Sequence, residues 1–181
     1  MPDRREAILS AAVATLREVG YSGFTQPRVA KRANVRQSHL TYYFPTRLAL
    51  LQAVGRIVVE NQLALIDVLL DVSSVQAAIK TITTAVVRLD STRVLMALAQ
   101  AADEESSLCH VFRELADGIA LRVGRLLQKL DIPATQEQIY LIHAVSVGLA
   151  VINLATQRPN RKRRVEAILA CAFNPLLQAK K

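Results

Sequence analysis

The chain has 181 residues, 51% of them hydrophobic and 21% charged, and its 23 Lys and Arg against 15 Asp and Glu give a formal net charge of +8. This length fits one compact domain, or a small module joined to a larger one. Abundant Leu, Ala and Val, with eight aromatic residues and no Trp, are typical of packed helices rather than of a β-sandwich or a disordered tail. We therefore predict an all-helical protein.

Cysteine usage and apolar segments narrow the class of protein further. Two cysteines, Cys109 and Cys171, exclude a disulfide scaffold, and no Cys or His spacing suggests zinc; we expect both to be buried or half-buried free thiols. No signal-peptide cleavage site follows the first apolar stretch. The most apolar window, 139–155, is interrupted by polar residues and is shorter than the span of about 18 residues that a membrane helix needs. We therefore expect a cytoplasmic protein without membrane contact, metal or cofactor.

Charge is concentrated in the first fifty residues. They carry eight Lys or Arg against three acids, a net charge of +5, whereas residues 51–130 have a net charge of −1. The same fifty residues hold five of the eight aromatic side chains. Such a block is typical of a nucleic-acid-binding module attached to another domain, and the alternative is a solvated basic face.

Helix signals in this block outline a helix-turn-helix. A first helix with apolar positions at helical spacing over 7–19 ends at Gly20. A second begins at the N-cap Thr25, and a third is expected over 36–43. Asn34 suits the left-handed conformation that the short turn between these two helices needs.

Six further helices are expected after Pro45. Thr46 begins a long helix that continues to about Asp71. The others are expected at 75–89, 92–102, 108–130, 134–156 and 161–178, with breaks at Ser73-Ser74, Asp90-Ser91, Ser106-Ser107, Ile132-Pro133 and Arg158-Pro159-Asn160.

Spaced positions through 7–54 also match a known family without a gap. They include Gly20-Tyr21, Thr25, Val29-Ala30, Arg32-Ala33, Val35, Leu40, Tyr42, Phe44-Pro45, Arg47 and Leu50-Leu51. The segment resembles the DNA-binding domain of the TetR (tetracycline-repressor-like) family of transcriptional regulators. The resemblance implies a three-helix DNA-binding domain over 1–46, joined by the long helix to a helical effector-binding and dimerisation domain over 47–181.

The resemblance assigns DNA contacts to particular side chains. In such a domain the second helix of the motif enters the major groove, and its first residues face base edges. The groups at these positions can hydrogen-bond bases, and they belong to Arg36, Gln37, Ser38 and His39. Phosphate contacts are implied for Thr25, Tyr42, Tyr43 and Arg47, with Arg28 in either role. Arg36 and Asn34 stand where the family usually has a small capping residue and a glycine.

The last two helices are expected to form a dimer interface. The helix at 134–156 is apolar on two sides, so two surfaces must cover it. The resemblance implies that both helices pair with their symmetry mates, and the alternative is burial within one subunit. The residues assigned to the interface are Ile142, Val145, Ser146, Leu149, Ile152, Val165, Ile168, Leu169, Ala172 and Phe173. A twofold dimer would read a palindromic operator. The basic run Arg161–Arg164 is either a solvated turn or a second anion-binding surface.

A small-molecule pocket is also implied by the resemblance. Its candidate lining residues are long or polar side chains on apolar faces, with a place in the core as the alternative: Asn61, Met96, Gln100, Phe112, His143 and Val147. His110 and His143 have no partner at metal-ligand spacing and are expected in the core or a pocket. Few charges in these segments favour a mostly apolar effector.

Taken together, these features predict a homodimeric repressor that a small effector releases from its operator. One alternative is an all-helical carrier or enzyme with an incidental basic N-terminus, although no His-Glu-x-x-His, Gly-x-Ser-x-Gly or Gly-rich phosphate motif is present and we predict no enzyme. The other is a DNA-binding regulator without an effector, or an activator.

Overall fold

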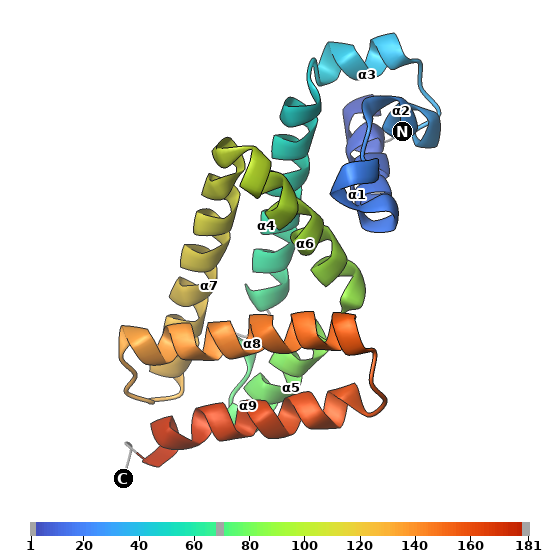
Figure 1. The fold of residues 1–181 in the computed structure, drawn as a ribbon. Coiled ribbons are helices and arrows are strands. Elements are labelled where there is room, and N and C mark those ends of the chain that lie inside the picture. The colour runs from blue at the N-terminus through green and yellow to red at the C-terminus, as the bar shows by residue number, and fades with distance from the viewer. Residues whose placement is uncertain (1–2, 68–70, 179–181) are drawn as a thin grey trace. The chain divides into compact units, whose positions relative to one another are not determined.

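The computed structural model describes residues 3–67 and 71–178, and this part of the chain contains helices and no strand (Figure 1). The helices are α1 (Arg4–Gly23), α2 (Gln26–Arg32), α3 (Gln37–Tyr43), α4 (Arg47–Asp67), α5 (Val75–Val86), α6 (Leu89–Glu104), the short 3₁₀ helix η2 (Ser106–Leu108), α7 (Cys109–Lys129), α8 (Gln136–Thr156) and α9 (Arg161–Gln178). The all-helical prediction, with an N-terminal helix-turn-helix, is confirmed.

Local sequence signals account for most of the N-terminal helix boundaries. The Asp3 carboxylate caps α1 by accepting a hydrogen bond from the backbone N–H of Arg5, and the Thr46 hydroxyl caps α4 by accepting one from Ala49 at 3.0 Å. Gly20, with φ 67° and ψ −173°, kinks α1 rather than ending it, because one further helical turn runs to Gly23.

The turn of the helix-turn-helix has the predicted backbone. Asn34 lies in the left-handed region at φ 54°, as expected. Thr25 and Arg36 occupy the N-cap positions of α2 and α3, and neither side chain makes a capping hydrogen bond. For Arg36 this is the lost cap that the departure from the family pattern implies, and for Thr25 it leaves the hydroxyl uncommitted.

Two predicted boundaries differ from the structure. The break expected at Asp90-Ser91 is wrong, because α6 already begins at Leu89; an aspartate in the first turn of a helix is favoured by the macrodipole and so does not mark a break. The long helix α4 is described as far as Asp67, and part of its predicted extension to about Asp71 lies outside the described residues.

The described residues form two compact units, and neither is continuous in sequence. Unit 1 comprises Met1–Glu60 and Arg93–Arg113. Its core joins buried side chains of α1 to α4, such as Leu16, Phe24 and Leu40, with Val94 and Leu98 of α6. A segment from the middle of the chain therefore completes the core around the helix-turn-helix.

Unit 2 comprises Asn61–Thr92 and Glu114–Lys181. Within it α8 and α9 lie side by side, and α5 packs against both (Figure 1). A capping box between Thr135 and Gln138 begins α8, and left-handed residues at Gln157 and Asn160 turn the chain into α9. The buried side chains of α9, including Leu169 and Phe173, form the centre of this core.

Two helices are long and apolar enough to cross a membrane by length and composition. These are α4 and α8, whose most apolar windows are 39% and 17% buried within the protein. The prediction that the window at 139–155 is too short for a span is therefore wrong as an argument from length. Core helices of soluble proteins share this character, so the finding is weak support for a membrane span. The low burial of α8 instead marks an apolar surface.

Candidate nucleic-acid interface

The start of α3 presents a row of polar side chains to solvent. Arg36, Gln37, Ser38 and His39 are all exposed, whereas Leu40, the next residue, is fully buried. Within the described residues, none of these four side chains has a hydrogen-bond or ion-pair partner. Their donors and acceptors are therefore available to base edges, as predicted from the sequence.

Core packing and a hydrogen bond at its C-terminal end hold α3 in position. Leu40 and Phe44 insert into the core of unit 1, and the Gln26 amide donates a hydrogen bond to the Phe44 carbonyl at 2.7 Å. That bond satisfies a carbonyl at the end of a helix, where intrahelical partners are missing. The row of polar side chains is thus carried on a rigid element, which base readout requires.

The tyrosines expected to contact phosphates lie at the far end of α3. Tyr42 is 80% exposed, the highest value among the exposed large hydrophobic side chains of the described chain. The half-buried Tyr43 packs edge-on against it, with ring centroids 5.2 Å apart. Thr25 at the start of α2 is exposed as well. All three predicted phosphate contacts are accessible.

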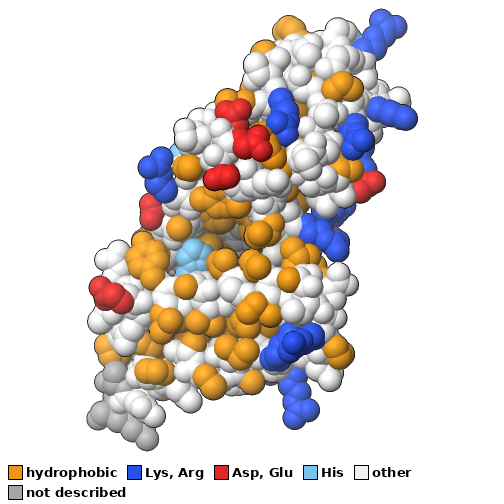
Figure 2. All heavy atoms as spheres, in the orientation of Figure 1, with side chains coloured by type: hydrophobic (Ala, Val, Ile, Leu, Met, Phe, Trp, Pro, Cys, Tyr) orange, Lys and Arg blue, Asp and Glu red, His pale blue; other side chains and the backbone are white. Residues whose placement is uncertain are grey.

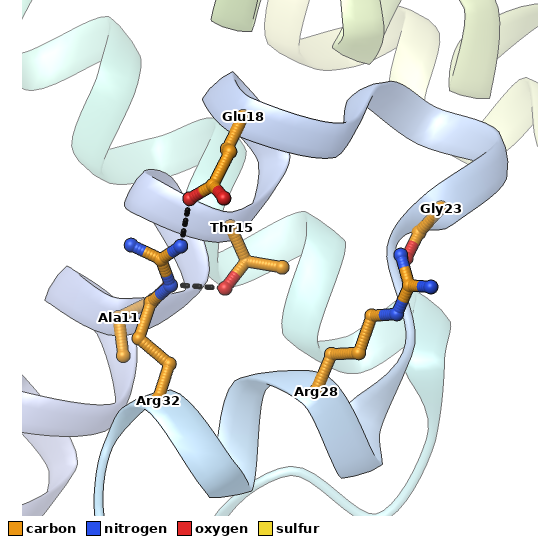
Figure 3. Close-up of polar contacts among 6 residues, drawn as sticks. All are labelled: Ala11, Thr15, Glu18, Gly23, Arg28 and Arg32. Carbon is orange, nitrogen blue, oxygen red and sulfur yellow. Dashed lines mark hydrogen bonds and ion pairs between the residues drawn. The ribbon is translucent and has the colours of Figure 1, made fainter.

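Two arginines of α2 make contacts within unit 1 (Figure 3). Arg28 donates from Nη1 to the Gly23 carbonyl at 3.2 Å and remains exposed, so it can exchange this bond for a phosphate. Arg32 forms an ion pair with Glu18 of α1. Exposed contacts of this kind contribute little to stability.

Arg47 makes contacts within unit 1 that were not predicted from the sequence. Its guanidinium donates to the Phe24 carbonyl (3.0 Å), the Tyr21 carbonyl (2.8 Å) and the Tyr21 hydroxyl (3.1 Å), and it lies over the Tyr21 ring, 4.1 Å from the centroid. These bonds fasten the end of α1 to the start of α4. Three of its five N–H donors are directed inward, so Arg47 has a structural role in unit 1, and its phosphate contact stays a prediction.

Tyr21 extends the same network to α6. Its buried hydroxyl donates to the Glu104 carboxylate at 2.8 Å. Burial raises the pKa of the phenol, the bond to Glu104 raises it further, and Arg47 lowers it. Sequence reasoning missed this contact, because Tyr21 and Glu104 are 83 positions apart and no local pattern joins them.

The candidate effector residues divide between the two units. Met96, Gln100 and Phe112 belong to unit 1, where Phe112 packs against the core. Asn61, His143 and Val147 belong to unit 2. Burial lowers the pKa of His143, so its imidazole is held neutral at physiological pH. The effector-binding role of these six residues remains a prediction.

Two open hollows indent unit 2 at the end of α7 and the start of α8. Their volumes are about 560 and 440 Å³, and both include Gly124, Gln128 and Ile139. Neither is lined by any of the six candidate effector residues. No sequence pattern predicted these hollows.

The dimer-interface candidates separate into two groups. Five of them face the core of unit 2, where this chain alone buries them: Ile142, Leu149, Val165, Leu169 and Phe173. Ile152 and Ile168 are exposed, and Val145, Ser146 and Ala172 are half-buried. Figure 2 shows hydrophobic side chains gathered over α8 and α9. The exposed large ones on these helices, which we call the α8–α9 face, are Tyr140, Leu141, Val147, Ile152, Ile168 and Leu177.

The basic run at the start of α9 is mostly solvated. Arg161, Lys162 and Arg163 are exposed, while Arg164 donates to the side-chain oxygen of buried Asn153 at 2.8 Å. That bond joins the ends of α8 and α9 and gives the run a partly structural role.

The cysteines and His110 are more exposed than predicted. Cys109 and Cys171 are free thiols on the surface rather than in the core. His110 is also exposed and contacts the Ser107 carbonyl. All three lie on outer faces of amphipathic helices, where residue type alone does not show which way a side chain points. Over the described ranges, no group of three or more His, Cys, Asp or Glu could hold a metal ion.

Comparisons with known proteins agree with this arrangement. Residues 8–54 match the family model of bacterial regulatory proteins of the tetR family. The transcriptional regulator RutR of Escherichia coli is 39% identical over 61 residues, which are 34% of this chain and 29% of RutR. Two solved structures share the fold over nearly the whole chain: a transcriptional regulator from Rhodococcus sp. RHA1 (TM-score 0.85, 21% identity, 97% and 96% of the two chains) and the multidrug-binding protein EbrR in complex with ethidium (TM-score 0.72, 21% identity, 94% and 98%).

Proposed function

We propose that the chain is a member of the TetR family of bacterial regulatory proteins, whose family model residues 8–54 match. In this proposal it is a homodimeric, cytoplasmic transcriptional repressor that a small effector releases from a palindromic operator. Residues 1–46 are the DNA-binding part, and 47–181 serve effector binding and dimerisation. The observation that carries the proposal is the row of four exposed and unpaired polar side chains at the start of α3.

These side chains contact bases, and neighbouring side chains contact the phosphate backbone. Gln37 can pair bidentately with adenine and Arg36 with guanine, whereas Ser38 and His39 suit several base edges. Thr25, Tyr42 and Tyr43, with Arg28, contact phosphates and set the register of α3 in the groove. Base preference and backbone affinity therefore depend on different residues.

The α8–α9 face supports a homodimer. Ile152 and Ile168 are exposed on adjacent helices, and large exposed apolar side chains in such a place are normally covered by protein. Ala144 and Gly148 are small residues on the same helix that permit close approach of a second helix. Two copies related by a twofold axis would present two α3 helices to half-sites about one helical turn apart.

The effector is proposed to be small and mostly apolar. EbrR, which shares the fold, is solved with ethidium, an organic ligand, and few charged residues occupy the middle helices of the present chain. An effector releases DNA only if it binds the non-binding conformation more tightly than the DNA-bound one. A regulator without an effector, or an activator, is the second candidate.

Selection from a random duplex pool tests the DNA-binding proposal. We expect a palindromic winner that binds far more tightly than its scrambled sequence at each salt concentration. Gln37→Ala and His39→Ala should relax base preference, and Thr25→Ala should weaken all sequences alike. Weak binding to both duplexes that disappears equally with salt would instead favour a carrier or enzyme with an incidental basic segment.

A further inference from the structure

We infer that the first turn of α1 forms an additional part of the DNA-binding surface, in which Arg5, whose guanidinium lies over the Phe44 ring, contacts a backbone phosphate beside those reached by the tyrosines of α3. This inference rests on the proposed DNA-binding function and adds a contact that the family pattern of residues 7–54 does not include.

The available positive charge of unit 1 points to this turn. Of the eight basic residues in 1–50, Arg28, Arg32 and Arg47 have partners within unit 1, and Arg17 also takes part in an interaction. In the described chain, the side chains of Arg4, Arg5, Lys31 and Arg36 form no hydrogen bond or ion pair. Two of these four uncommitted cations are adjacent at the start of α1.

The structure fixes where one of them lies. The Arg5 guanidinium is 5.7 Å from the centroid of the Phe44 ring, within the range of a cation–π contact. Phe44 directly follows α3 and is preceded by Tyr42 and Tyr43. The first turn of α1 therefore lies beside the end of α3 where phosphate contacts are expected.

The contact with Phe44 suits the guanidinium for a phosphate. Arg5 is exposed while it lies over the ring, so its N–H donors can reach a phosphate oxygen. Phe44 is 4% exposed, so the ring is a fixed platform. Restricting the side chain before binding lowers the entropy lost when the phosphate is bound.

Helix stability does not account for the two arginines. Positive side chains in the first turn of a helix oppose its macrodipole and so destabilise it slightly. Arg4 and Arg5 are both exposed and occupy that turn of α1. A contact with polyanionic DNA offsets this cost in the complex.

The test measures DNA affinity as the salt concentration is raised. The DNA is either a short duplex of mixed sequence or the selected operator. The proteins compared are the full-length wild type, Arg5→Ala, Arg5→Lys and the control Lys80→Ala. Lys80 is exposed on α5 in unit 2, so the Lys80→Ala substitution removes the same charge from the unit without proposed DNA contacts. Losing one phosphate contact per subunit of a dimer lowers the salt slope by about 1.8, or about sixtyfold in affinity near 0.1 M salt. Arg5→Lys should keep the slope, because the ammonium also neutralises a phosphate.

Each outcome decides the inference. An Arg5→Ala variant with the wild-type slope, or a Lys80→Ala variant with an equal loss of slope, overturns it while DNA binding stands. Arg5→Lys with a slope as low as that of Arg5→Ala also overturns it. A wild-type protein that binds no duplex refutes the DNA-binding function itself. Thermal unfolding without DNA, expected to be nearly unchanged, excludes a folding defect as the cause.

Discussion

Replacing Arg47 by Met removes the hydrogen bonds that fasten the end of α1 to the start of α4, while it keeps a side chain of similar length. The change leaves the carbonyls of Phe24 and Tyr21 and the Tyr21 hydroxyl without their donor. It also removes the cation–π contact with the Tyr21 ring.

The expected cost follows from these contacts. A hydrogen bond to a charged group contributes about 1.5–3 kcal/mol, and an exposed cation–π contact about 0.5–1 kcal/mol. The terms are not additive, and Arg47 is only half-buried, so water can replace part of what is lost. We therefore expect a loss of about 3 kcal/mol, a large share of the roughly 5–15 kcal/mol by which a domain is stable.

Urea unfolding measures this loss, with Arg32→Met as the matched control. The Arg32 and Glu18 side chains are 38% and 62% exposed, so their ion pair should contribute less than about 1 kcal/mol. An Arg47→Met variant no less stable than Arg32→Met would refute the structural role. The dependence of DNA affinity on salt should be unchanged in folded Arg47→Met. A weaker dependence would instead show that Arg47 contacts a phosphate.

Three further predictions follow from single features. Gly20→Ala should lower the free energy of unfolding in urea by about 1–3 kcal/mol, because the positive φ strains an alanine. A Cβ at Gly20 meets nothing within 4 Å, so no clash adds to this cost. Asn34→Gly should be tolerated, and equal losses in the two variants would contradict this reasoning. Because burial lowers the pKa of folded His143 from 6.5, stability should be full above pH 6.5 and decline as pH falls toward the folded pKa, and His143→Gln should flatten that decline in pH-dependent melts. Ile152→Arg should give a monomer in analytical ultracentrifugation and Leu121→Arg, equally exposed on α7, should not; a monomeric wild type would refute the dimer.

The helix boundaries could be predicted because their causes are local. The Thr46 hydroxyl caps the residue three positions on, and Asn34 adopts its own left-handed conformation, so a short sequence window contains the whole interaction. Asp90 misled the prediction, since the same residue type can break a helix or stabilise its first turn. The polar row of α3 follows from the register of Leu40, which a helical period fixes.

The remaining features depend on contacts that a linear pattern does not contain. The α8 helix is apolar on both sides, so periodicity alone could not show that Ile142 and Leu149 face the core while Ile152 faces outward. An arginine such as Arg47 near a DNA-binding motif has the same residue type whether it contacts a phosphate or a carbonyl. Only the partner distinguishes the two.

Because α6 completes the core of unit 1 and Glu104 binds Tyr21, the N-terminal helices alone cannot be transferred to another protein as an independent domain. During synthesis the core of unit 1 cannot close until the ribosome has released the chain beyond residue 113, with the segment 61–92 emerging in between. Recombination that exchanges only the first sixty residues would likewise bring a foreign α6 into contact with Tyr21. Changes in the DNA sequence that this chain prefers are therefore expected to arise by substitution within α3 rather than by exchange of the whole of unit 1.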